Sequence, residues 1–214
     1  MACSGRYERA AWAQGFVRVA GLDEAGRGCL FGPVCAAAVI LNPERSIRGL
    51  NDSKQLEPQR RVLLAGRIRE RALAWAVEFV DAPTIDRINI LQASRLAMKR
   101  ALERLSLQPD YLLVDAVRLD SSIEQLPLIH GDARSFSIAA ASILAKVDRD
   151  AALAEFDRDY PGYGLASNKG YGTPDHLRAL TALGPTPLHR YSFGPVRAAA
   201  GLDPVQPCLF GATD

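Results

Sequence analysis

Phe16-Val17-Arg18-Val19-Ala20-Gly21-Leu22 runs directly into Asp23-Glu24-Ala25-Gly26-Arg27-Gly28, and the rest of the chain can be arranged around this segment. Its apolar and β-branched residues predict a short strand that ends in two adjacent carboxylates. Like charges this close repel, and a bound divalent cation would remove that cost; oxygen ligands suit Mg²⁺ or Mn²⁺. The flanking glycines let the backbone bend towards a ligand while Arg27 meets a phosphate. An ordinary strand-to-loop turn with two solvated acids is the competing interpretation.

Composition sets the class of protein. The 214 residues suit one sizeable domain, and the 48% apolar and 23% charged fractions are ordinary for a globular protein. No run reaches the roughly 18 apolar residues of a membrane span, and no signal peptide is recognisable. The scattered cysteines predict free thiols in a reducing cytoplasm rather than disulfides or a zinc site. A net charge of +2 permits a polyanionic partner without requiring one.

Further elements follow in order along the chain. Apolar patterns predict strands at 33–41 and 73–80 and helices at 58–71, 88–107 and 174–183. Tyr111-Leu112-Leu113-Val114-Asp115 is another strand that ends in a carboxylate, and it follows a long helix as a parallel crossover requires. Parallel neighbours would bring Asp23 and Asp115 to one carboxyl edge, where open α/β sheets place ligands.

Asp132 stands just ahead of a predicted helix over 135–156, whose small residues would let it lie close against a sheet. A short strand is expected to begin at Leu128-Ile129. Asp132 could cap the helix, or the helix N-terminus could hold it ionised as a metal ligand. Both interpretations stay open.

Residues 160–173 are rich in glycine and tyrosine and predict a loop. Tyr171 lies between two glycines near Lys169, which suits stacking and phosphate contact with a nucleic acid. Lys146, four residues after Ser142 on one helical face, could contact phosphate or pair with a nearby carboxylate. The three histidines are expected to be structural or solvated: His130, His176 and His189.

These motifs resemble the ribonuclease HII (type 2 ribonuclease H) family. The resemblance covers residues 17–197 and is carried by GLDEAGRG at 21–28, NDSKQL at 51–56, LLVD at 112–115, GDARSFSIAAASILAKVDRD at 131–150, YPGYGLASNKGYGTPDHL at 160–177 and HRYSFGPV at 189–196. It implies an α/β ribonuclease H-like fold with a five-stranded mixed sheet, flanking helices and C-terminal helices. The expected division is a lead-in at 1–15, a catalytic domain at 16–197 and a tail at 198–214.

The resemblance also implies a site and an activity. Catalytic metal ligands would be Asp23, Glu24, Asp115 and Asp132, holding two Mg²⁺ or Mn²⁺ ions when substrate is bound. The resemblance implies substrate contacts at Gly26, Arg27, Gly28 and Tyr171. Further candidates for substrate binding, which the resemblance does not supply, are Lys54, Ser142, Lys146 and Lys169. The implied reaction hydrolyses the RNA strand of RNA–DNA hybrids and cuts 5′ of ribonucleotides embedded in duplex DNA, during replication and repair. A two-metal mechanism would leave 5′-phosphate and 3′-hydroxyl ends.

Some features depart from the family pattern, namely Cys29-Leu30-Phe31, Gln55 and Ala116-Val117-Arg118. Because none of them removes a ligand acid, we expect these departures to affect substrate preference rather than activity itself. Two rival functions are another metal nuclease of this fold, such as a junction resolvase, and a catalytically silent hybrid-binding protein. We expect a cytoplasmic monomer that does not bind membranes.

The C-terminal tail carries a separate signal. Gln206-Pro207-Cys208-Leu209-Phe210 is similar to the short Gln-x-x-Leu-Phe peptides with which bacterial repair proteins bind the sliding clamp. Gln206, Leu209 and Phe210 would make the contact. The alternative is that Leu209 and Phe210 fold back onto the domain.

Overall fold

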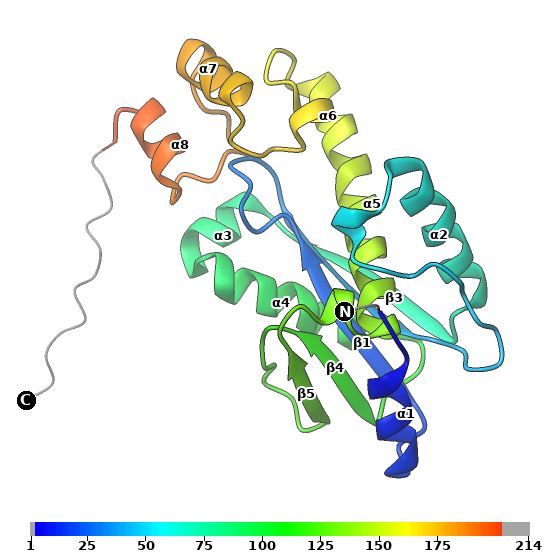
Figure 1. Cartoon of the computed structure of the whole chain (residues 1–214). Coiled ribbons are helices and arrows are strands. Elements are labelled where there is room, and N and C mark those ends of the chain that lie inside the picture. Colours follow the sequence, from blue (N-terminus) through cyan, green and yellow to red (C-terminus); the bar gives the residue numbers. More distant parts are fainter. Residues whose placement is uncertain (1–2, 203–214) are drawn as a thin grey trace, which may run out of the picture.

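The sheet confirms the expected five-stranded mixed architecture. The computed structural model describes residues 3–202. Its strands are β1 (Val19–Ala25), β2 (Val34–Ile40), β3 (Ala74–Val80), β4 (Tyr111–Asp115) and β5 (Glu124–Leu128). They lie in the order β3-β2-β1-β4-β5; β1 is antiparallel to β2 and parallel to β4, which places it at the centre (Figure 1).

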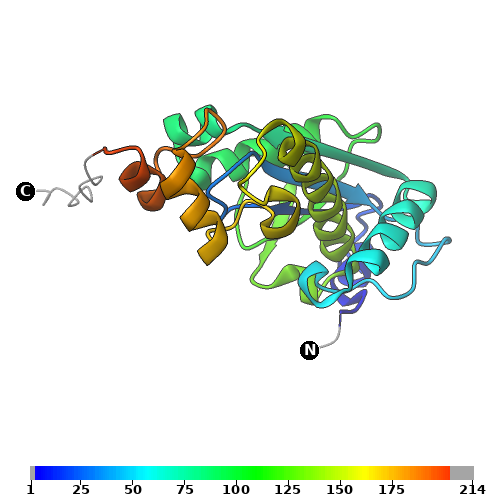
Figure 2. The ribbon, with the colours of Figure 1, turned by 90° about the horizontal axis from the view of Figure 1, so that it is seen from above.

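Helices cover both faces of this sheet, as β2 shows. Val34, Ala36, Ala38 and Ile40 of β2 belong to one buried cluster, and the residues between them belong to another. The first cluster includes α3 (Ala82–Ile88) and α4 (Ile90–Glu103), and the second includes α2 (Pro58–Arg71) and α5 (Phe136–Asp159). Figure 2 shows the two helix pairs on opposite sides of the sheet. A strand buried on both faces reads as a continuous apolar run, and this explains the sequence at 33–41.

The long helix α5 lies directly on β1. A Cβ at Gly21 would lie 2.1 Å from the carbonyl carbon of Ser137, so only glycine permits this approach. The small residues of the helix, Ala139, Ala140 and Ala141, are fully buried. The small side chains therefore let α5 lie close against the sheet, as the sequence predicted, and the structure places it on β1.

The structure corrects several expectations. The helix predicted over 88–107 is α4, which spans only Ile90–Glu103, and α3 before it was not predicted. Asn89 adopts φ 67° between the two helices, and its side chain accepts the Gln92 N–H and starts α4. The strand expected to begin at Leu128 instead ends there. Its pattern was obscured by Pro127, which an edge strand tolerates.

The terminal segments pack onto this core. The lead-in contains α1 (Arg6–Ala13), whose Glu8 carboxylate accepts hydrogen bonds from the Ser135 hydroxyl at 2.6 Å and the Ser137 N–H at 2.8 Å. The C-terminal helices are α6 (Leu165–Asn168), α7 (Pro174–Leu183) and α8 (Gly194–Ala199), and they lie together at the top of Figure 1. The short helix α6 interrupts the segment 160–173, for which the sequence predicted a loop. Across residues 3–202, no helix is long and apolar enough to cross a membrane.

Candidate active site

Two strands place the first three predicted acids at one edge of the sheet. Asp23 and Glu24 lie in β1, and Asp115 is the last residue of β4. The parallel register pairs Leu22 with Val114, so the next residues along the two strands, Asp23 and Asp115, are neighbours. The convergence expected from a parallel crossover is confirmed.

Asp132 reaches the same place through a backbone contact. It lies in the 3₁₀ helix η2 (Gly131–Ala133), and Asp115 Oδ1 accepts the Gly131 N–H at 2.7 Å. Asp132 Oδ1 accepts the Ala133 N–H at 2.9 Å, whereas α5 is capped by the Ser135 hydroxyl, which accepts the Ile138 N–H at 3.2 Å. Asp132 therefore does not cap the long helix, and its second oxygen faces Lys54 Nζ at 3.9 Å.

Burial and mutual repulsion raise the pKa of these acids. Asp23 is 4% exposed, and burial raises its pKa well above the usual range, with the charges of Glu24 and Asp115 adding to the effect. Burial also raises the pKa of Glu24, although the nearby Arg27 guanidinium opposes the shift. The pKa values of Asp115 and Asp132 are raised by burial as well. Four carboxylates whose ionisation is opposed by burial form a site in which a cation would be stabilised.

The donor set suits a hard divalent cation by its chemistry, but not by its spacing in this structure. It contains oxygen atoms only, and Glu24 Oε2 is buried without a hydrogen-bond partner among the described residues. Within residues 3–202, no three acidic, histidine or cysteine side chains form a compact group that could hold a metal ion. One carboxylate oxygen each of Asp115 and Asp132 accepts a backbone N–H instead.

The glycine–arginine–glycine loop next to the acids is in contact with two buried arginines. Gly26 adopts φ 93°, and a Cβ there would lie 1.9 Å from Arg149 Nε. Arg190 Nη1 donates to the carbonyl oxygen of Arg27 at 2.9 Å, and Arg27 Nη1 lies 3.2 Å from Glu24 Oε1. The loop conformation is thus fixed by two arginines of distant segments.

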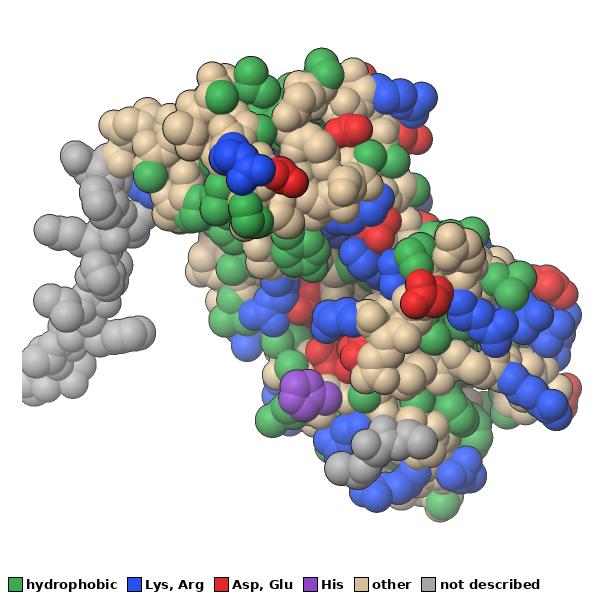
Figure 3. Space-filling model, turned by 45° about the horizontal axis from the view of Figure 1, so that its top comes forward, with side chains coloured by type: hydrophobic (Ala, Val, Ile, Leu, Met, Phe, Trp, Pro, Cys, Tyr) green, Lys and Arg blue, Asp and Glu red, His purple; other side chains and the backbone are tan. Residues whose placement is uncertain are grey.

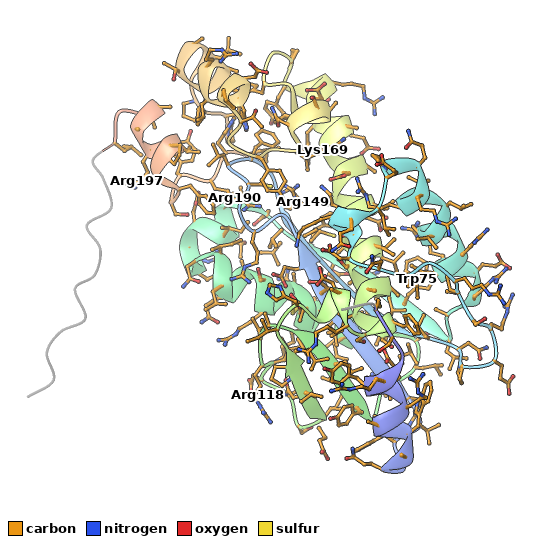
Figure 4. The ribbon with its side chains drawn as sticks, viewed as in Figure 1. Trp75, Arg118, Arg149, Lys169, Arg190 and Arg197 are labelled. Atoms are coloured by element: carbon orange, nitrogen blue, oxygen red, sulfur yellow. The ribbon has the colours of Figure 1, made fainter. Side chains whose placement is uncertain are left out.

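Arg149 and Arg190 are the residues that sequence reasoning missed. Both are fully buried, and their guanidinium groups donate to backbone carbonyl oxygens, those of Phe31, Pro33 and Lys169 for Arg149 and of Arg27 and Gly32 for Arg190. Figure 4 shows both side chains below the C-terminal helices, close to Lys169. Arginines in polar stretches read as surface residues, and the motifs KVDRD and HRYSF were the signal that could have identified them.

A cavity of about 240 Å³ lies over the loop. Its lining contains eight of the predicted site residues: Glu24, Gly26, Arg27, Gly28, Lys54, Ser142, Lys146 and Tyr171. Figure 3 shows acidic side chains in the middle of this face with basic side chains around them. Lys169 is not among the lining residues, and its carbonyl oxygen accepts from Arg149 instead.

Several of the lining side chains already have partners. Lys146 Nζ lies 2.7 Å from Asp150 Oδ1, which is the salt bridge that the sequence left open, and 5.9 Å from the centre of the Tyr171 ring. The hydroxyl groups of Ser142 and Ser53 are 2.9 Å apart. Tyr171 is 40% exposed and can offer its ring to a ligand. The predicted segment 206–210 lies outside the described residues.

Comparisons with known proteins show the family and the fold. A family model described as "Ribonuclease HII" matches residues 20–196. The chain is 63% identical to a ribonuclease HII from Solibacter usitatus over 196 residues, which cover 92% of this chain and 86% of the relative. It is similar to the crystal structure of ribonuclease H2 from Pyrococcus horikoshii, with a TM-score of 0.73, 26% identity, and 86% and 98% of the two chains covered. It is also similar to the RNase HII in a PCNA:RNase HII complex from Archaeoglobus fulgidus, with a TM-score of 0.68, 26% identity, and 80% and 91% covered.

Proposed function

Because the chain belongs to the ribonuclease HII family, and is therefore a ribonuclease H endonuclease, we propose that it also cuts duplex DNA 5′ of single embedded ribonucleotides. Ribonuclease H activity on RNA–DNA hybrids follows from the family. The proposal adds the isolated ribonucleotide as substrate, divalent metal ions as cofactors and ribonucleotide removal during replication and repair as the role.

One observation carries the proposal. Four carboxylates with raised pKa values lie at one edge of the sheet. One of them, Glu24, lines a cavity together with a glycine-rich loop, basic side chains and an exposed tyrosine. Acids supply metal ligands, and the basic groups and aromatic ring are the ordinary means of holding a nucleic-acid backbone. A substrate that carries phosphate, ribose and base would meet all of these groups at once.

The acids Asp23, Glu24, Asp115 and Asp132 would hold Mg²⁺ or Mn²⁺. When bound, such ions activate a water molecule and stabilise the leaving oxygen at phosphorus. The unpartnered Glu24 Oε2 and the charge repulsion at Asp23 support this role, since both costs fall when a cation arrives.

The chain's own residues would select and orient the substrate. The backbone of Gly26–Gly28 and the Arg27 side chain lie beside the acids, where they can meet the ribose 2′-hydroxyl, the group that separates RNA from DNA. Lys54, whose side chain is 79% exposed, can reach a phosphate. Tyr171 would stack on the sugar or base at the junction. Ser142 and Lys146 line the cavity, and Lys169, which does not, would contact the substrate through its side chain.

A panel of labelled substrates tests the proposal. The full-length protein is incubated with a duplex that contains one ribonucleotide, the matched all-DNA duplex, an RNA–DNA hybrid and a four-way DNA junction, each with Mg²⁺, Mn²⁺ or EDTA. We expect cleavage of the single-ribonucleotide duplex and of the RNA–DNA hybrid, and only when Mg²⁺ or Mn²⁺ is present. Cleavage of the junction without ribonucleotides would favour a junction resolvase, and tight hybrid binding without cleavage would favour a silent binding protein.

A second proposed contact concerns the tail. Gln206, Leu209 and Phe210 have the chemistry of a clamp-binding peptide, and the solved Archaeoglobus fulgidus relative is in complex with PCNA. We expect a labelled peptide of residues 203–214 to bind the organism's sliding clamp, and a peptide with Leu209→Ala and Phe210→Ala to lose binding. Equal binding of the two peptides, or none at tens of micromolar, would remove the proposal.

A further inference from the structure

A buried chain of side chains ends at the backbone of Tyr171. His176 of α7 and His189 in the segment after α7 are both fully buried. The Thr186 backbone nitrogen lies 3.0 Å from His189 Nδ1, the two Nε2 atoms lie 3.2 Å apart, and His176 Nδ1 lies 2.9 Å from the Tyr171 carbonyl oxygen. The chain therefore links the segment after α7 to the substrate cavity.

The partners at the two ends fix where the protons lie. A carbonyl oxygen only accepts, so His176 Nδ1 carries a hydrogen and donates to Tyr171. In the neutral ring His176 Nε2 is then an acceptor, and His189 Nε2 must carry the hydrogen between the two rings. His189 Nδ1 is left to accept the Thr186 N–H. Each ring is a single tautomer, and all hydrogen bonds point from Thr186 towards Tyr171.

Both imidazoles stay neutral in this arrangement. Burial lowers the pKa of His176, and it lowers the pKa of His189 to about 4. A second proton on His176 would set two N–H groups against each other across the 3.2 Å contact, and a second proton on His189 would face the Thr186 N–H at 3.0 Å.

Other contacts also restrain the backbone around Tyr171. The Tyr171 carbonyl oxygen also accepts the Thr173 N–H at 2.8 Å, and Arg149 donates to the Lys169 carbonyl oxygen at 2.9 Å. Gly170 adopts φ 78°, and a Cβ there would lie 2.8 Å from the Phe31 carbonyl oxygen. The peptide that carries the tyrosine ring thus has little freedom while the ring itself remains exposed.

We propose that His176 and His189 are positioning residues, which hold the Tyr171 peptide so that its ring meets the substrate at the ribonucleotide. The inference rests on the proposed function of Tyr171 in substrate binding. Loss of the His176 donor would leave the carbonyl oxygen with one fewer partner and let the ring sample orientations that do not match the substrate.

A double-mutant cycle tests the inference in the full-length protein. Cleavage of the single-ribonucleotide duplex is measured for His176→Leu, Tyr171→Ala and the double variant. We expect His176→Leu to lower kcat/KM by about tenfold, the effect of one lost buried hydrogen bond. The double variant should be no slower than Tyr171→Ala alone, because the histidine acts through the tyrosine.

Two further variants separate positioning from simple stability. Leu180→Ala removes a buried side chain of the same helix that has no bond to Tyr171, and its loss of activity, if any, should add to that of Tyr171→Ala. His176→Asn, whose amide nitrogen can donate in place of Nδ1, should recover most of the activity. Additive losses for His176→Leu and Tyr171→Ala would overturn the inference.

Nitrogen NMR of the substrate-free protein gives a readout that does not depend on activity. We expect the Nδ1–H tautomer for His176 and the Nε2–H tautomer for His189. The reverse tautomers would overturn the inference even if the enzyme cuts the duplex. A wild-type protein that shows these tautomers but leaves the ribonucleotide duplex intact would contradict the proposed function instead.

Discussion

Asp115 Oδ1 accepts the backbone N–H of Gly131 at 2.7 Å, and this bond joins the end of β4 to the segment that carries Asp132. Under the proposed function, the third acid would have two tasks. One carboxylate oxygen orders the backbone that presents the fourth acid, and the other is available to a ligand. An asparagine at position 115 keeps an oxygen for the first task but loses the negative charge required by the second.

Asp115→Asn is thus expected to abolish activity without unfolding the protein. Loss of a ligand charge that stabilises the reaction by several kcal/mol should lower kcat by about a thousandfold or more. Steady-state cleavage of an RNA–DNA hybrid at saturating Mg²⁺ or Mn²⁺ measures the effect. Asp120→Asn, an exposed acid of the following loop, is the matched control and should retain wild-type turnover. Near-normal turnover of Asp115→Asn would remove Asp115 from the ligand set.

Asp23→Asn should make the metal-free protein more heat-stable. Asp23 is buried against other carboxylates, and its pKa is raised because ionisation there is costly. Removing that cost should raise Tm by about 2–4 °C per kcal/mol for a chain of this size. Differential scanning calorimetry in EDTA at neutral pH measures the change. Excess Mn²⁺ should then stabilise the wild type more than the variant, and a lower Tm for Asp23→Asn in EDTA would contradict the electrostatic account.

Tyr171→Ala should weaken cleavage at an isolated ribonucleotide and leave stability nearly unchanged. Base–aromatic stacking contributes about 1–3 kcal/mol, so kcat/KM should fall by about fivefold to a hundredfold. Tyr171→Phe keeps the ring and should stay close to wild type. A large drop in Tm with full activity would identify Tyr171 as a packing residue instead.

Gly26→Ala and Gly28→Ala form a matched pair in the loop. The alanine Cβ at position 26 would lie 1.9 Å from Arg149 Nε at a φ of 93°, whereas at position 28 its nearest neighbour is the Tyr171 ring at 3.9 Å. We expect Gly26→Ala to lower both Tm and activity, and Gly28→Ala to preserve Tm. Thermal melts and hybrid cleavage of the two variants are compared directly, and equal Tm values would contradict the close contact with Arg149.

His189 predicts a pH dependence of stability. Burial lowers its pKa from 6.5 to about 4, so between these pH values the unfolded chain binds more protons than the folded one. The neutral ring contributes fully to the stability of the folded protein above pH 6.5, and this contribution is lost as the pH falls towards 4. As the pH falls from 6.5 to 4, the Tm of the wild type should therefore decrease more than the Tm of His189→Phe. The carboxylates titrate in both proteins, so their effect largely cancels, and a constant difference would contradict the assignment.

Most of the strands, the longer helices and the convergence of the acids could be predicted, because they follow from local apolar patterns and from the order of elements along the chain. Asp23 and Asp115 could be brought together because a strand, a helix and a second strand imply a parallel crossover. Helix α3 was not predicted, and its end depends on the positive φ of Asn89, which an apolar pattern does not record. Arg149 and Arg190 were missed for a different reason. Their partners are carbonyl oxygens more than a hundred residues away along the chain, except for Lys169, and no periodicity records such contacts.

The position of the cut tests the central claim most directly. A duplex with one ribonucleotide, labelled at either end, is incubated with the wild-type protein and Mg²⁺ or Mn²⁺, and the products are identified by mass spectrometry. The account predicts one incision immediately 5′ of the ribonucleotide, with a 3′-hydroxyl on one fragment and a 5′-phosphate on the other, and none in EDTA. An incision 3′ of the ribonucleotide, a cyclic phosphate end, or equal cleavage in EDTA would contradict it.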